Sequence, residues 1–212
     1  MASALRRPAV AESATADEAS NFYFDRDHQL NAVKLLPGEC HVTDEDMVLV
    51  TVLGSCVAAC IRDPLLGIGG MNHFMLPDAG NDAGTPMSAS ARYGSYAMEL
   101  LINQLLKRGA RRAALEAKVF GGGNVLKGFT VANVGDRNAA FVIEYLKTEK
   151  IQVVARDLCD IYPRKVYYFP KTGKVLVKRL RSAHNDTILE RERDYGSRLR
   201  AAPVAGDIEL FS

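Results

Sequence analysis

The 212-residue sequence predicts an α+β fold, a layered sandwich of largely antiparallel strands with helices packed on it. Segments with strand-like apolar patterns outnumber segments with helical spacing. Several of these strands also follow one another without a helix between them, an order that disfavours a doubly wound parallel sheet. The composition is that of a globular protein, with 48% hydrophobic and 25% charged residues.

The first half of the domain is predicted to consist mainly of strands. Three extended segments occur in order: Met47–Leu53, Cys56–Ile61 and Gly67–Leu76. The first, MVLVTVL, is apolar throughout, which is typical of a strand buried on both faces. Gly54 and Ser55 separate it from the second segment, and Asp63 and Pro64 begin a turn before the third. A loop rich in Pro, Gly and Asp follows over Pro77–Pro86.

The second half alternates helices and strands. The clearest helix runs from about Ser90 to Lys107, because its apolar residues form one stripe at helical spacing, and Gly109 ends it. A second helix begins with Asp136 as its N-cap. Four further strands are predicted: Ala117–Phe120, Ile151–Leu158, Lys165–Phe169 and Lys174–Leu180. The strands Lys165–Phe169 and Lys174–Leu180 flank a Pro-Lys-Thr-Gly turn and predict a β-hairpin. The glycine turn Gly121–Asn124 directly follows the strand Ala117–Phe120.

The chain is predicted to have one domain with two extensions. Residues 1–20 form a solvated leader rich in Ala and Ser. The globular domain spans residues 21–180, without an internal repeat or a low-complexity linker. Residues 181–212 form a charged C-terminal extension, in which the run Glu190–Asp194 alternates acidic and basic residues. Such a run is typical of a solvated helix face or a frayed tail.

Charge and hydropathy exclude several classes of protein. With 27 basic and 25 acidic residues the net charge is only +2, and Trp is absent, so no nucleic acid partner is expected. The longest strongly apolar run, Met47–Leu53, is far shorter than the roughly 20 residues of a membrane helix, so no membrane insertion is expected. No segment near the N-terminus resembles a signal peptide. We therefore expect a cytoplasmic protein with its four cysteines reduced.

Cys56 and His73 are the strongest candidates for chemistry. A buried strand that stops at a Gly-Ser pair presents the Cys56 thiol on a turn, where the following backbone N–H groups can hold an oxyanion. If the two strands pair through the turn at Asp63, His73 returns beside Cys56. An imidazole there lowers the pKa of the thiol and later protonates an amine leaving group. The alternative is that Cys56 is core filler, as we expect for Cys60.

A structural zinc site is a competing interpretation. Four soft ligands occur in the region: Cys40, His41, Cys56 and Cys60. Adjacent Cys and His do not easily bind one ion, however, and the chain has no C-x-x-C pair. The turn Gly121–Asn124 lacks the Lys-Ser/Thr of a P-loop, so a tight turn or a close backbone approach is favoured over a phosphate site.

A basic cluster lies at the C-terminal end of the first predicted helix: Lys107, Arg108, Arg111 and Arg112. Cations are favoured at a helix C-terminus because they interact with the helix dipole. The cluster is either solvated surface or a docking site for an acidic helical partner.

Six motifs are spread over residues 30–180. They are Lys34–Glu39 (KLLPGE), Leu53–Ala58 (LGSCVA), Gly69–Pro77 (GGMNHFMLP), Arg92–Gly94 (RYG), Gly121–Asn124 (GGGN) and Asn133–Asn138 (NVGDRN). Together they resemble the CheD family, the chemoreceptor glutamine deamidases of bacterial chemotaxis. Both extensions lie outside the resemblance.

The resemblance implies a fold, a reaction and a site. The fold would be similar to the catalytic domain of cytotoxic necrotising factor toxins, a layered α+β sandwich. Family members hydrolyse the side-chain amide of particular glutamines on methyl-accepting chemotaxis receptors, giving glutamate and ammonia. The family's nucleophilic cysteine falls on Cys56, its histidine on His73 and its triad threonine on Thr51. We expect the backbone N–H groups around Ser55 and Val57 to hold the oxyanion, and no metal or organic cofactor to be required.

The resemblance also implies partners. Receptor cytoplasmic domains are long acidic helical hairpins, so the basic surface near Arg108 and Arg112 is a candidate docking site. In some bacteria CheD is a partner of CheC, a CheY phosphatase, and raises its activity. The alternative function is therefore a regulatory adaptor that acts on a CheC-type phosphatase. The presence of both Cys56 and His73 favours the enzyme.

Overall fold

The structure is a computed structural model, and the residues it describes are 18–76, 89–125, 134–180, 190–192 and 194–197. Most of the expected leader, the loop expected over Pro77–Pro86 and most of the expected C-terminal extension lie outside them. The described end of the leader belongs to the fold. The Ala19 N–H donates to the Cys40 carbonyl (3.1 Å), and Ala19 is buried.

Two five-stranded sheets, here called the central sheet and the outer sheet, form the framework. The order of the central sheet is β3 (Cys40–Thr43), β6 (Ile68–Asn72), β5 (Val57–Asp63), β7 (Glu116–Gly121) and β8 (Gln152–Leu158). The order of the outer sheet is β1 (Asn21–Asp25), β2 (Leu30–Lys34), β4 (Met47–Leu53), β9 (Arg164–Phe169) and β10 (Lys174–Arg179). Strands β2 and β4 pair parallel, as do β7 and β8, and the other neighbours pair antiparallel. The predicted α+β class is confirmed.

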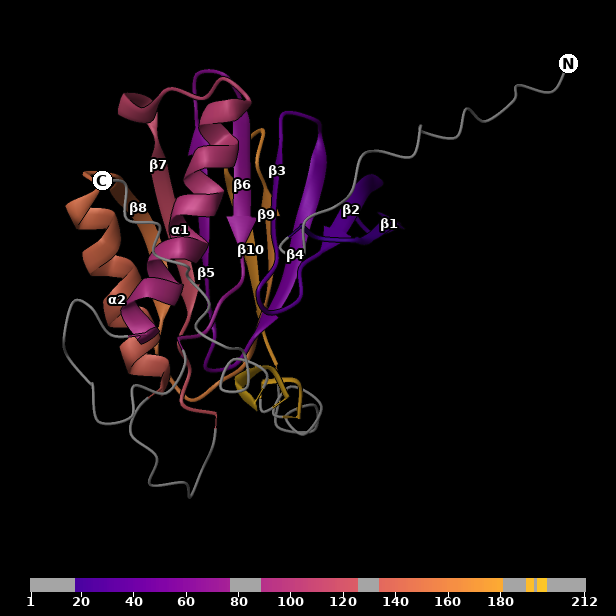
Figure 1. Ribbon diagram of the computed structural model, residues 1–212. Helices are drawn as coiled ribbons and strands as arrows, with labels where there is room; N and C mark the ends of the chain where they lie inside the picture. Colours follow the sequence, from indigo (N-terminus) through magenta and orange to yellow (C-terminus); the bar gives the residue numbers. More distant parts are fainter. Residues whose placement is uncertain (1–17, 77–88, 126–133, 181–189, 193, 198–212) are drawn as a thin grey trace, which may run out of the picture.

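The molecule is layered as helices, central sheet and outer sheet (Figure 1). Helices α1 (Ala89–Lys107) and α2 (Val134–Thr148) pack against β5 and its neighbours. Buried helix residues such as Leu101 and Val142 share one hydrophobic cluster with residues of β5. A second cluster lies between the two sheets. The central sheet is thus covered on both faces. Within the described parts of the chain, no helix has the length and apolarity to span a membrane.

The alternation along β5 places Cys56 between the two sheets. Successive side chains of an extended strand point to opposite faces. Val57 and Ala59 belong to the cluster beneath the helices, whereas Cys56, Ala58 and Cys60 belong to the cluster between the sheets. Because both faces are covered, the segment is apolar throughout rather than alternating in polarity.

Among the residues that the structure describes, the sequence interpretation found seven of the ten strands and both long helices. The expected hairpin is present as β9 and β10. Strands β1, β2 and β3 were not predicted, because each has only four or five residues and β1 is largely exposed, so none has a long apolar run. A short 3-10 helix, Arg112–Ala114, precedes β7. Helix α2 begins at Val134, two residues before the expected cap Asp136.

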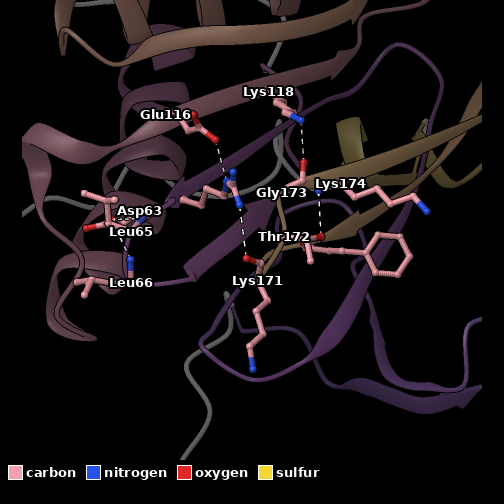
Figure 2. A network of polar contacts seen from close by, with 11 residues as sticks. Asp63, Leu65, Leu66, Glu116, Lys118, Lys171, Thr172, Gly173 and Lys174 are labelled. Atoms are coloured by element: carbon pink, nitrogen blue, oxygen red, sulfur yellow. Dashed lines mark hydrogen bonds and ion pairs between the residues drawn. The ribbon is translucent and has the colours of Figure 1, made fainter.

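A polar network attaches the turn of the β9–β10 hairpin to the central sheet (Figure 2). Arg62 Nε donates to Glu116 Oε1 (2.8 Å), which links β5 to β7. Arg62 also donates to the Lys171 carbonyl (3.5 Å), and Lys118 Nζ donates to the Gly173 carbonyl (2.7 Å). These contacts hold the two sheets together at the end of the sandwich where β5 finishes.

Asp63 closes the turn that follows β5, at the same end of the sandwich (Figure 2). Its buried carboxylate accepts hydrogen bonds from the N–H groups of Leu65 (2.9 Å) and Leu66 (3.2 Å). It also accepts from the backbone N–H and the guanidinium of Arg111, at 3.0–3.1 Å. The Arg111 guanidinium, aided by the three N–H groups, holds the pKa of Asp63 well below its ordinary value.

Asp63→Asn is expected to lower the free energy of unfolding at neutral pH by about 1–3 kcal/mol, because a neutral amide cannot accept all of these hydrogen bonds. The folded-state pKa of Asp63 is lower than its unfolded-state pKa. The stability from the carboxylate is therefore present above about pH 4 and decreases as the pH falls below it. Urea unfolding of both proteins at about pH 7 and about pH 3 should show the difference shrinking at the lower pH. An equal difference at both pH values would contradict a role for the charge.

Candidate active site

The segment that joins β4 to β5, residues 54–56, is held by hydrogen bonds to all three of its carbonyl groups. The Gly123 N–H donates to the first carbonyl (2.7 Å) and the Gly122 N–H to the last (2.8 Å). The buried side-chain amide of Asn138 on α2 donates to the middle one (2.8 Å). The glycine turn, residues 121–124, therefore makes a close backbone approach, as predicted. Because these hydrogen bonds hold the carbonyl groups on one side of the segment, its backbone N–H groups on the opposite side can bind a ligand.

The predicted antiparallel pairing of β5 with β6 is present. In the register set by the bridge between Val57 and Phe74, His73 lies opposite Ala58. His73 is thus a diagonal neighbour of Cys56 on the face between the sheets. Diagonal neighbours are about 7–8 Å apart, a separation that a side chain as long as histidine can bridge. The structure brings the two sequence candidates together on one surface.

Thr51 of β4 reaches His73 from the outer sheet. The Thr51 Oγ1 and His73 Nδ1 atoms are 2.8 Å apart, and the Thr51 hydroxyl donates to the Leu35 carbonyl (2.9 Å). A hydroxyl has a single proton, so Thr51 Oγ1 must accept from the Nδ1–H of His73. The imidazole proton is therefore on Nδ1. The Nε2 atom, which is buried and has no hydrogen-bond partner among the described residues, keeps its lone pair.

Burial sets the protonation states of both side chains. It lowers the pKa of His73 to about 4, so that the imidazole is neutral at neutral pH and can accept a proton at Nε2. Burial raises the pKa of the Cys56 thiol, and the neighbouring Glu192 carboxylate raises it further. In the conformation seen here Cys56 is therefore a thiol rather than a thiolate.

The carboxylate of Glu192 occupies the N–H side of residues 54–56. Its Oε1 accepts from the N–H groups of Gly54 (3.0 Å) and Cys56 (3.1 Å). Its Oε2 accepts from the N–H (3.0 Å) and the hydroxyl (2.6 Å) of Ser55. Residues 190–192 and 194–197 are helical and lie at one end of the sandwich (yellow in Figure 1). Three consecutive N–H groups that bind a carboxylate are also suited to an oxyanion.

Val57 differs from the sequence expectation. Its N–H donates to the Phe74 carbonyl (2.9 Å), because the strand ladder has already resumed at this residue. An N–H group bonded within a ladder is not available to an oxyanion. The converging N–H groups are those of Gly54, Ser55 and Cys56, a set displaced toward β4 from the expected one.

The other cysteines that were considered as zinc ligands, Cys40 and Cys60, do not converge on a common site with Cys56. Cys60 lies in the core between the sheets, where burial raises the pKa of its thiol. The Cys40 thiol donates to Gln104 Oε1 (3.5 Å) instead of facing Cys56. Within the described ranges, no group of three or more His, Cys, Asp or Glu side chains could hold a metal ion.

The basic cluster after α1 is engaged in ion pairs and lies far from Cys56. Three arginines are paired within the fold: Arg108 with Asp44, Arg111 with Asp63 and Arg112 with Glu149. Asp63 is the last residue of β5, whereas Cys56 precedes its first residue. A seven-residue strand spans about 20 Å. The position of the cluster therefore gives no support to its expected role in docking a substrate at Cys56.

The family model and the most similar relatives agree on one family. A family model described as CheD chemotactic sensory transduction matches residues 75–179. The probable chemoreceptor glutamine deamidases CheD of Janthinobacterium sp. (strain Marseille) and Thiobacillus denitrificans are each 64% identical to this chain, over 194 and 193 residues. These alignments cover 92% and 91% of the chain and 96% of each relative. The chain belongs to the CheD family. Among solved structures, the Bacillus licheniformis protein YfiH has a TM-score of 0.36 and 13% identity, covering 57% of this chain and 51% of that one.

Sequence reasoning missed two residues at this CheD-family site. Asn138 lies within a motif that carries the resemblance, but only α2 packing shows that its amide supports residues 54–56. Glu192 was expected on a solvated run, yet it is only 8% exposed, and Tyr195 only 7%. The signal available in the sequence was the spacing of Glu192 and Tyr195. Residues three apart lie on one face of a helix, and an aromatic residue on that face favours its burial.

Proposed function

We propose that this CheD-family chain hydrolyses specific glutamine side chains on methyl-accepting chemotaxis receptors, giving glutamate and ammonia. The names of its relatives, probable chemoreceptor glutamine deamidases, support the reaction class. The observation that carries the proposal is the arrangement around Cys56. A buried thiol shares a sheet face with the neutral imidazole of His73 and adjoins three N–H groups that bind a carboxylate. A thiol, a base and an oxyanion site together favour acyl transfer through a thioester.

In the first half of the proposed reaction, Cys56 Sγ attacks the carbonyl carbon of the glutamine side chain while His73 Nε2 accepts the thiol proton. The carbonyl oxygen becomes an oxyanion, stabilised by the N–H groups of residues 54–56. The C–N bond then breaks as His73 returns its proton to the nitrogen, and ammonia leaves. The product at this stage is a thioester on Cys56.

In the second half, His73 Nε2 accepts a proton from a water molecule that attacks the thioester carbonyl. The C–S bond breaks, the proton returns to the sulfur, and the glutamate side chain is released. The sum is amide plus water giving carboxylate and ammonium. No step uses a metal or an organic cofactor. The Thr51 hydroxyl is hydrogen-bonded to His73 and to the Leu35 carbonyl, so its proposed part is that of a positioning residue for His73.

The proposed substrate also implies a location and a set of partners. Receptor cytoplasmic domains carry the target glutamines, so we propose that the protein acts in the cytoplasm. A CheC-type phosphatase is a second proposed partner. A purely regulatory adaptor would not require a neutral imidazole beside a buried thiol, so this pairing favours the enzyme. We also propose a fold similar to the catalytic domain of cytotoxic necrotising factor toxins, which the stacking of two sheets beneath helices supports.

Mass spectrometry of a receptor cytoplasmic fragment tests the proposed function. The fragment is incubated with the reduced, folded protein and then mapped for conversion of amide to acid at individual glutamines. Conversion at a small set of sites is the expected result. If several receptors show no conversion, while the same protein raises the activity of a CheC-type phosphatase, the adaptor function replaces this one.

Thr51→Val is expected to lower kcat by about 10²-fold, because His73 loses the acceptor that keeps its proton on Nδ1. Thr51→Ser keeps the hydroxyl and should restore most of the activity. The apparent pKa of the ascending limb of the pH–rate profile should also move in Thr51→Val. If Thr51→Val and Thr51→Ser lose activity equally, with matching thermal unfolding, the positioning role is wrong.

A further inference from the structure

Glu192 is the strongest feature of the structure that the proposed reaction does not use. It makes four hydrogen bonds to residues 54–56, three of them to consecutive backbone N–H groups. A Cβ added at Gly54 would lie 2.9 Å from Oε1 of this carboxylate, so the carboxylate packs directly against residue 54. Four hydrogen bonds to a carboxylate from so distant a residue indicate that residues 54–56 form a binding site for a planar carboxylate or amide group.

Tyr195 anchors the same helical segment at a second point. It is buried, and its hydroxyl contacts the hydroxyl of Tyr93 on α1. Its ring covers Gly38, where an added Cβ would lie 2.8 Å from Oη and 3.1 Å from Cε2. Glu192 and Tyr195 are three positions apart in the sequence, and both are buried against the domain. Both anchors pack against glycines of the domain, Gly54 and Gly38, and we take the surface around these two residues as the candidate substrate groove.

The chemistry of Glu192 matches the product of the proposed reaction. Glutamine and glutamate side chains have the same length, and deamidation of the first gives the second. A carboxylate on the N–H groups of residues 54–56 therefore has the position of the product group directly after thioester hydrolysis. The carboxylate also excludes a substrate amide, because one oxyanion site holds one group.

We propose that the helical residues 190–192 and 194–197 form an internal, product-like occupant of the substrate groove. The groove accordingly takes a helix that presents a glutamine to Cys56 and a bulky side chain, three residues later, to Gly38 and Tyr93. This inference rests on the proposed function and names its substrate geometry and its regulation. A receptor helix displaces the segment when it binds.

Tethering makes the segment an effective competitor. A group attached to the same chain is present at millimolar effective concentration when the linker allows it to reach the site. The apparent KM for a receptor helix is then raised by the reciprocal of the fraction of molecules with an open groove. Displacement also removes the carboxylate that raises the pKa of the Cys56 thiol, so substrate binding and activation of the thiol are coupled.

Glu192→Gln tests the proposal directly, because it places an amide where the product carboxylate now lies. Peptide mapping should show that the introduced amide is converted to acid at a rate independent of protein concentration, as expected for a reaction within one chain. The conversion should be absent in Glu192→Gln combined with Cys56→Ala. The matched control is Glu190→Gln, which introduces an amide at an exposed residue of the same segment and should keep it.

Glu192→Ala provides the second measurement, with a receptor cytoplasmic fragment as substrate. Its apparent KM should be lower than that of the wild type by about tenfold. The inference is overturned if the wild type deamidates the receptor fragment but the amide of Glu192→Gln persists, or if the KM of Glu192→Ala is unchanged. If the folded protein converts neither receptor nor the introduced amide, the proposed function itself fails, and this inference fails with it.

Discussion

Cys56→Ala is expected to abolish glutamine deamidation, with a loss in kcat of at least about 10³-fold. The thiol is the only protein group in the proposed reaction that forms a bond to the substrate carbon, and alanine has no atom to replace it. Binding of a receptor fragment should persist, because the N–H groups of residues 54–56 belong to the backbone. The measurement is site-resolved mass spectrometry of receptor glutamines, together with binding by calorimetry.

Cys60→Ala is the matched control for Cys56→Ala. Both cysteines are buried in the same cluster between the sheets, and both point to the same face of the central sheet. Removing either sulfur costs about 1 kcal/mol or more of packing. We expect Cys60→Ala to show this loss of stability in urea unfolding while it keeps its activity. Equal loss of activity in the two variants, at equal stability, would show that Cys56 acts through packing alone.

Gly121→Ala should have the largest effect on stability, about 3 kcal/mol or more, together with loss of activity. Gly121 has φ +109°, which a residue with a Cβ rarely adopts. The added Cβ would also lie 2.2 Å from the carbonyl oxygen of Cys56. Backbone atoms cannot yield as a flexible side chain does, so residues 54–56 would have to move and the N–H groups would no longer converge.

Gly109→Ala separates the two causes of this effect. Gly109 also has a positive φ, +99°, but a Cβ there would meet no atom within 4 Å. This variant is therefore expected to lose only about 1 kcal/mol from backbone strain. Thermal unfolding and deamidation assays on both variants measure the difference. A loss of stability in Gly121→Ala no larger than that in Gly109→Ala would contradict the proposed clash with Cys56.

Local patterns in the sequence were sufficient for much of the framework. Met47–Leu53 was predicted residue for residue, because a strand buried on both faces must be apolar throughout. The pairing of β5 with β6 followed from the turn at Asp63, since a tight turn returns the chain antiparallel. Short strands such as β1 lack a long apolar run, and pairing alone defines them.

The candidate site was predicted in part. Cys56 and His73 were selected from a glycine break and a returning strand, both of which are local features. The contact between Thr51 and His73 joins two sheets, so its hydrogen bond required the layered packing to be known. Val57 was assigned an oxyanion role because the sequence does not reveal where the ladder resumes. One hydrogen bond to Phe74 removes its N–H from the site.

The sequence by itself determined the class of fold, the family resemblance and the two candidate side chains, Cys56 and His73, that share the face between the sheets. All three depend on periodicity, turns and motifs, which are properties of neighbouring residues. Only the tertiary structure decided which N–H groups converge and which carboxylate they bind. Ser55 and Glu192 are separated by 137 positions, and no local pattern encodes a contact across that distance. That contact exists because folding brings residues 190–192 against the N–H side of residues 54–56, where Gly54 has no side chain.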